Sequence, residues 1–89
     1  MYKVLWEEDA LEELSKLWLK LKPIEINAAI KVIERQLSQG AEQAGESRSR
    51  ASERILIVEP LCLYFSIEYR DRERTAVIQH VWPIYKPSR

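Results

Sequence analysis

Three runs of β-branched and aromatic residues follow one another closely in the last third of the chain, at residues 54–82. They read RILIVEP, LCLYFSIEY and TAVIQHVW, with a charged DRER turn between the second and the third. Runs this short and this close together favour an antiparallel meander, because a parallel connection needs a dozen or more residues. The sequence therefore predicts three consecutive antiparallel strands.

The first half of the chain has helical periodicity instead. An alternating run at residues 2–6 predicts a short first strand, and the acidic residues 7–9 after it suit a helix N-terminus. A second amphipathic helix is expected over residues 24–39, stopped by Gly40. With so short a link between them, the two helices should form an antiparallel hairpin. The apolar stripe predicted for the first helix comprises Ala10, Leu11, Leu14, Leu17, Trp18 and Leu21.

These elements predict a single α+β domain over residues 1–89, in the order β-α-α-β-β-β. An antiparallel sheet would be packed on one face by the N-terminal helix hairpin. In the central strand, residues 63, 65, 67 and 69 form the expected core face, whereas residues 76–82 leave the core orientation open. The polar segment 40–53 lacks large apolar residues, and we interpret it as a mobile functional loop or as an inert linker.

Composition excludes several classes of protein. No apolar run approaches the ~20 residues that a membrane-spanning helix needs, and the N-terminus lacks the pattern of a signal peptide. We therefore expect a cytoplasmic chain that does not bind membranes. Cys62 and His80 are the only residues of their types, so neither a disulfide nor a His/Cys zinc site can form within the chain. No metal and no cofactor are expected.

Positive charge is concentrated in the second half of the chain. Residues 47–89 carry eight Lys/Arg against five Asp/Glu, although the net charge of the whole chain is zero. Arginine suits bidentate phosphate contacts, so Arg48 and Arg50 in the GESRSR segment are candidates for binding phosphate or another acidic target. The alternative is that these charges only solvate strand ends and turns.

The order of elements resembles the RelE/ParE superfamily, the toxins of bacterial type II toxin–antitoxin and plasmid-stabilisation modules. The residues that carry the resemblance are YKVLWEEDALEELSKL, RILIVEPLCLYFSIEY and TAVIQHVW, so it spans nearly the whole chain. It implies a sheet whose helix-free, concave face is the working surface. It also implies a cognate antitoxin that wraps around the toxin, and either a homo-oligomer or a toxin–antitoxin hetero-oligomer.

The resemblance implies two different activities. RelE-like members cleave messenger RNA on the ribosome, which requires a base, an acid and cations for the phosphorane. ParE-like members act on DNA gyrase. Cys62 stands where a RelE-like arginine is expected on the central strand, and Pro83 follows the last strand where a second one is expected. We therefore expect a ParE-like toxin or one with a depleted RelE-type site. The alternatives are a RelE-like endoribonuclease and a non-toxic interaction module of the same fold.

If the chain is an enzyme, its candidate catalytic residues are His80, Tyr85 and Arg54. His80 changes charge near neutral pH, Tyr85 lies near a tail tyrosine of the family, and Arg54 could supply phosphate charge. Each has a structural alternative: a packed histidine, a surface anchor and a solvated strand-end arginine. Trp6 and Trp82 lie at strand ends and are candidates for an apolar rim that receives the antitoxin.

Overall fold

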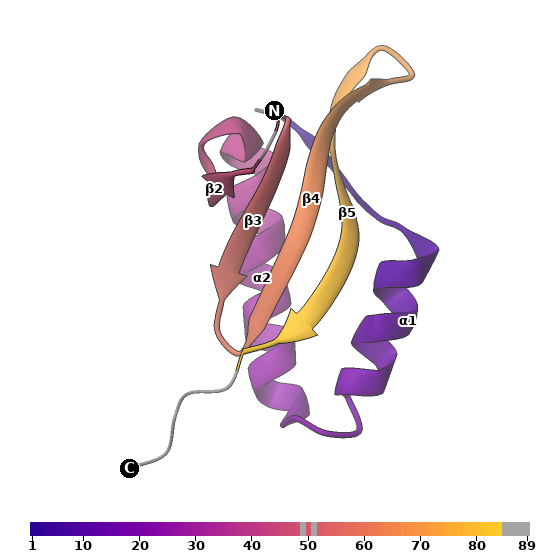
Figure 1. The fold of residues 1–89 in the computed structure, drawn as a ribbon, viewed down its shortest axis with the longest axis vertical. Helices are drawn as coiled ribbons and strands as arrows, with labels where there is room; N and C mark the ends of the chain where they lie inside the picture. Colours follow the sequence, from indigo (N-terminus) through magenta and orange to yellow (C-terminus); the bar gives the residue numbers. More distant parts are fainter. Residues whose placement is uncertain (49, 51, 85–89) are drawn as a thin grey trace.

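A computed structural model describes residues 1–48, 50 and 52–84, so the candidate Tyr85 lies outside the described residues. The chain forms two layers, with helices on one side and a five-stranded sheet on the other (Figure 1). The predicted α+β class is confirmed, and one short strand is added before the meander. None of the described helices is long and apolar enough to cross a membrane. The elements are β1 Lys3–Trp6, α1 Glu8–Leu17, α2 Pro23–Gly40, the 3-10 turn η1 Ala41–Gln43, β2 Glu46–Ser47, β3 Glu53–Val58, β4 Leu61–Arg70 and β5 Glu73–Pro83.

The sheet is mixed, and the prediction of a wholly antiparallel sheet is wrong at its first strand. The strand order is β1-β5-β4-β3-β2, and β1 pairs parallel with β5 while the other neighbours are antiparallel. The cause is the path of the helices. Only Glu7 separates β1 from α1, and α1 continues in the direction of β1, so that α2 alone returns the chain (Figure 1). β3 and β5 consequently run in the same direction as β1.

The core lies between α2, α1 and the sheet. In Figure 1, α2 lies behind β3 and β4, and α1 lies beside β5. The buried apolar side chains of the helices are Ala10, Leu14, Leu17, Ile26, Ala29, Ile33 and Leu37. They pack with the strand side chains of Leu56, Leu61, Leu63, Phe65, Ala76, Ile78 and Val81. The two predicted amphipathic helices are therefore confirmed, and their apolar stripes face the sheet.

Three residues predicted for the core lie outside it. α1 ends at Leu17, one residue before Trp18, whose side chain is 36% exposed, and Leu11 is 50% exposed on the outer side of the helix. Tyr69 is 73% exposed because the β4–β5 hairpin extends beyond the end of the helices (Figure 1). Periodicity identifies a face but does not say how far the neighbouring element reaches.

A bulge in β5 settles the core orientation that the sequence leaves open. Tyr64 of β4 pairs with His80, but Phe65 pairs with Ile78, so Gln79 is an extra residue on β5. Because side chains alternate along a strand, one extra residue transfers every later side chain to the other face. Ile78 and Val81 are consequently both buried against the helices, although they are separated by two residues.

The segment 40–53 contacts the core, although it lacks large apolar residues. Ala41 and Ala44 are buried in the same core as the helices. Arg54 holds the end of this segment, because its Nε donates to the carbonyl of Ala44 at 2.7 Å and its Nη2 to that of Gly45 at 2.9 Å. Small side chains and backbone carbonyls attach this polar segment to the domain, and neither leaves a hydrophobic pattern in the sequence.

The two glycines of the chain provide a matched stability test. Gly45 has a φ of +67°, and a Cβ there would lie 2.0 Å from the carbonyl oxygen of Ile55. We expect Gly45→Ala to lower the free energy of unfolding by at least ~2 kcal/mol, since both the backbone strain and the clash with Ile55 oppose it. A Cβ on Gly40 would meet only a side-chain atom of Gln43 at 3.8 Å, so Gly40→Ala should stay within ~1 kcal/mol. Urea denaturation of both variants checks this, and equal losses would contradict the assigned turn geometry.

Candidate functional site on the free face of the sheet

The sheet has one face that no described helix covers, called here the free face. On β4 the core residues Leu61, Leu63 and Phe65 alternate with Cys62, Tyr64 and Ser66, which must therefore point to the opposite side. Figure 1 views the molecule from this side, with the strands in front of α2. The free face is the surface that the sequence analysis expected to be the working surface.

Strand register arranges the free face in two neighbouring rows. One row consists of Ile55, Tyr64 and His80, on β3, β4 and β5. It is called here the polar row, because Tyr64 and His80 carry hydrogen-bonding groups. The apolar row runs from Ile57 through Cys62 to Trp82 on the same three strands. The free face thus places hydrogen-bonding groups directly beside apolar surface.

Tyr64 is the centre of the polar row. Its ring and that of His80 have centroids 6.4 Å apart and are tilted by 46°. Desolvation and a hydrogen bond with Glu53 raise the pKa of Tyr64, while the charges of Arg50 and Arg48 lower it. Because a carboxylate only accepts hydrogen bonds, the Tyr64 hydroxyl donates its proton to Glu53, and the raised pKa keeps that proton on the phenol at neutral pH.

His80 is held from the side by α1. The Oε1 atom of Glu13 lies 3.4 Å from Nδ1 of His80 and accepts a hydrogen bond from the backbone N–H of Val81 at 3.0 Å. The side chains of His80 and Glu13 are 53% and 40% exposed, so both remain accessible to a ligand. The polar row therefore contributes a phenol and an imidazole, and the carboxylates of Glu13 and Glu53 and two arginines lie near it.

The structure brings together some of the predicted site residues and separates others. Arg48, Arg50 and His80 all lie around Tyr64. Arg54 lies opposite Phe65 on the helix side of the sheet, where its guanidinium binds the Ala44 and Gly45 carbonyls.

Tyr64, Glu53 and Glu13 were not among the site residues predicted from the sequence. For Tyr64 a signal was present, because it alternates with the apolar residues of β4. Glu53 and Glu13 carried no such signal, since their place depends on strand register and on the position of α1.

The two candidate partner-binding tryptophans are placed differently. Trp6 is partly buried against the core, and its Nε1 donates to Oε2 of Glu34 on α2 at 3.2 Å. Trp82 is 38% exposed on the free face, in one row with Ile57, which is 57% exposed. Trp82 therefore contributes to an accessible apolar surface, whereas Trp6 joins β1 to α2.

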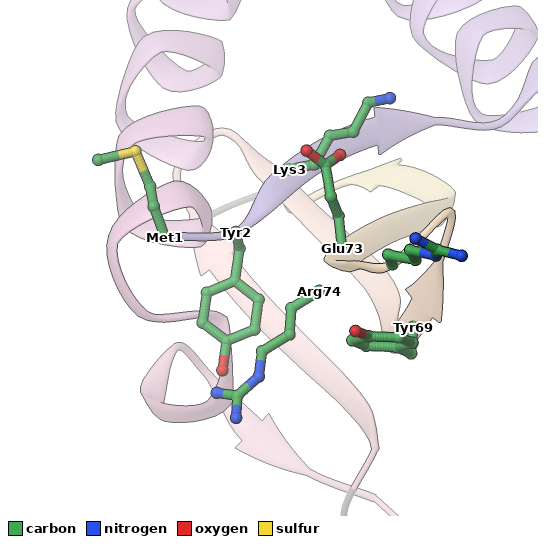
Figure 2. Close-up of a pocket in the computed structure, with 7 residues that line it drawn as sticks. Met1, Tyr2, Lys3, Tyr69, Glu73 and Arg74 are labelled. Atoms are coloured by element: carbon green, nitrogen blue, oxygen red, sulfur yellow. The ribbon is translucent and has the colours of Figure 1, made fainter.

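A separate hollow of about 680 Å³ lies where β1 meets the β4–β5 hairpin. Figure 2 shows Tyr2 and Arg74 side by side on one side of it and Tyr69 on the other. The guanidinium of Arg74 lies 6.0 Å from the centre of the Tyr2 ring and 3.7 Å from Glu42. Arg74 is paired with the Glu42 carboxylate, but Lys3 and Arg72 also line the hollow, so it is a second cationic surface that is separate from the polar row.

Metal binding finds no support in the described part of the chain. No three or more His, Cys, Asp or Glu side chains of residues 1–48, 50 and 52–84 come together as a metal ion would need.

Comparison with known proteins identifies the fold. No protein-family model and no curated protein matches the sequence. A chain of the toxin–antitoxin complex RelBE2 from Mycobacterium tuberculosis is similar in structure, with a TM-score of 0.73, 24% identity and coverage of 92% of this chain and 96% of that one. A chain of the chromosomal ParDE toxin–antitoxin system from P. aeruginosa has a TM-score of 0.61, 18% identity and coverage of 96% and 98%. The RelE/ParE-type fold implied by the sequence is confirmed.

Replacing Glu53 tests the electrostatics of the polar row. We expect Glu53→Gln to lower the pKa of Tyr64 toward its ordinary value of 10.0, because a carboxylate no longer opposes the phenolate. Because the pKa of Tyr64 is higher in the native state, it contributes stability below pH 10, and this contribution is lost as the pH rises through the native pKa. Glu53→Gln should therefore reduce the decrease in the free energy of unfolding at alkaline pH. NMR titration of the Tyr64 ring carbon, assigned with Tyr64→Phe, measures the shift. Glu46→Gln on β2 is the control, and an equal effect there would refute the pairing.

Proposed function

We propose that this chain is the toxin of a type II toxin–antitoxin pair, that it acts in the cytoplasm, and that it binds its target through the free face. The observation that carries the proposal is structural likeness over nearly the full length to chains of two different toxin–antitoxin complexes. The accessible polar and apolar rows on the face opposite the helices support it, because a toxin needs a surface for its target and a surface for its antitoxin.

Among the possible targets, the side chains of the free face favour a DNA gyrase-type protein target over cleavage of RNA. RNA cleavage without a metal needs cations at the phosphate, close to the acid and the base. On β4 the free-face neighbours of Tyr64 are Cys62 and Ser66, which carry no charge. Arg70 lies at the far end of the strand, where its Nε contacts Glu68 at 2.8 Å, and Arg54 faces the helices. A surface of this kind binds a target more readily than it cuts one.

Ribosome-dependent cleavage of messenger RNA is the second candidate, and one observation favours it. Tyr64 and His80 stand side by side in the polar row, with Arg48 and Arg50 close enough to influence the pKa of Tyr64. A protonated phenol, an imidazole and two guanidinium groups could together supply an acid, a base and phosphate charge. Only an activity assay separates this candidate from the first.

A growth assay with a paired RNA assay tests the function. We expect induced expression to arrest bacterial growth without cleavage of ribosome-bound messenger RNA, as measured by primer extension. The double variant Arg48→Ala/Arg50→Ala should weaken target binding about tenfold or more and relieve the arrest, since hydrogen bonds to charged groups are worth ~1.5–3 kcal/mol each. Lys31→Ala/Arg35→Ala, on the exposed side of α2, is the charge-matched control.

Each other outcome of this assay has a defined meaning. Cleavage of messenger RNA would establish the second candidate. If the Arg48→Ala/Arg50→Ala variant still arrests growth, these two arginines do not bind the target. Absence of any arrest by the unaltered chain would leave a non-toxic interaction module of the same fold.

The apolar row is the surface that we assign to the antitoxin. β2 pairs only with Arg54 and Ile55, so the outer edge of β3 beyond Ile55 has no strand partner among the described residues. An extended segment of the antitoxin could add a strand at this edge and place apolar side chains against Ile57 and Trp82. Both side chains are accessible, and tryptophan is a frequent anchor of protein interfaces.

Loss of protection by the antitoxin tests this assignment. We expect Ile57→Lys to abolish protection by the cognate antitoxin while toxicity is retained, because a charge in the apolar row would be buried unpaired in the complex. Leu11→Lys is the matched control, since Leu11 has a similar exposure of 50% but lies on α1. Co-expression growth curves and co-purification measure protection and binding. Full protection of the Ile57→Lys toxin would place the antitoxin elsewhere.

A further inference from the structure

We propose that Glu13 is a positioning residue of the free face. Its carboxylate holds His80 in the tautomer that carries the proton on Nδ1, so that Nε2 points away from α1 as a hydrogen-bond acceptor. The functional part of this inference rests on the proposed function of the free face, whereas the tautomer itself does not. Glu13 and His80 are far apart in the sequence and meet only because α1 packs beside β5.

The β5 bulge creates the need for Glu13. β1 accompanies β5 only as far as Ile78, whose carbonyl accepts the N–H of Glu7 at 2.9 Å as the chain enters α1. Beyond that point α1 replaces β1 as the neighbour of β5. The N–H of Val81, two residues after the extra residue Gln79, donates to the side chain of Glu13 at 3.0 Å. The carboxylate thus supplies an acceptor where the sheet supplies no further strand on this side.

The same oxygen atom determines the state of His80. Oε1 of Glu13 lies 3.4 Å from Nδ1 of His80 as well as 3.0 Å from the N–H of Val81. An ionised carboxylate only accepts hydrogen bonds. If Nδ1 carried no proton, its lone pair would face a lone pair of the Glu13 oxygen, which is unfavourable. If Nδ1 carries the proton, its N–H faces an acceptor. The neutral ring of a histidine side chain in water favours the opposite tautomer, with the proton on Nε2. Glu13 therefore reverses the intrinsic preference of the ring.

The assigned tautomer defines what His80 can do. With Nδ1 occupied by Glu13, Nε2 lies on the opposite side of the ring and carries a free lone pair. Tyr64, whose ring centroid is 6.4 Å away, donates its hydroxyl proton to Glu53 and presents its hydroxyl oxygen as an acceptor. With His80 in the neutral form, the polar row therefore offers a ligand two acceptors next to each other, Nε2 of His80 and the hydroxyl oxygen of Tyr64. This arrangement suits an N–H or O–H donor of a target, such as a backbone amide or a hydroxyl group.

NMR of the imidazole nitrogens tests the inference directly, because His80 is the only histidine in the chain. Spectra of the ¹⁵N-labelled full chain, recorded where the imidazole is neutral, should show a protonated Nδ1 and an unprotonated Nε2. In Glu13→Ala the ratio of tautomers should move toward Nε2–H by about tenfold, since a charge-assisted hydrogen bond is lost. Glu13→Gln should largely retain the original tautomer, because the amide oxygen can still accept. Glu12→Ala, on the exposed side of α1, is the control.

Two results would overturn the inference: an Nε2–H tautomer in the unaltered chain, or the same tautomer ratio in Glu13→Ala as in the unaltered chain. The circular dichroism spectrum and the amide signals of residues that do not contact Glu13 establish that the variants remain folded. The growth assay separates this inference from the proposed function. A shifted tautomer with growth arrest unchanged would uphold the positioning of His80 by Glu13 and remove His80 from the target site. Absence of toxicity in every variant would leave the tautomer measurement intact.

Discussion

The single extra residue in β5 decides which side chains the rest of the molecule can use. Before the bulge the strand buries Ala76 and Ile78 against the helices, and after Gln79 it buries Val81. Without the bulge, Val81 would leave the core, and His80 and Trp82 would turn toward the helices. With it, His80 stands next to Tyr64 and Trp82 next to Cys62. Both rows of the free face, and the contact between Val81 and Glu13, follow from this one irregularity.

Arginine has two separate uses in this fold, and strand register assigns them. Arg54 lies opposite Phe65, on the side of the sheet that carries the core, and its guanidinium holds the backbone of Ala44 and Gly45. Arg48 and Arg50 lie near Tyr64 on the other side and act on its charge. Since Arg54 satisfies two carbonyls in the η1–β2 connection, its replacement would disturb the path of the chain there. A loss of activity in an Arg54 variant would therefore report on folding rather than on chemistry.

The free face combines two properties that the proposed toxin function requires. The polar row has hydrogen-bonding and charged groups in accessible positions, and the apolar row next to it continues to an open edge of β3. A partner that covers the apolar row would also restrict access to the polar row, because the rows are adjacent on the same three strands. Target binding and neutralisation would then compete through proximity alone, with no change of conformation required.

Sequence periodicity alone determined the two amphipathic helices, the three long strands of the meander and the core face of β4, because burial on one face leaves a regular pattern. The charge distribution, the single histidine and the aromatic residues at strand ends made Arg48, Arg50, His80 and Trp82 candidates without any use of periodicity. Only the tertiary structure decided the parallel pairing of β1, which depends on the direction of α1, and the attachment of segment 40–53, which depends on backbone carbonyls. It likewise decided that Arg54 faces the helices and that Glu13 reaches His80. These features arise from register, from one bulge and from contacts between distant segments, and none of them imposes a period on the sequence.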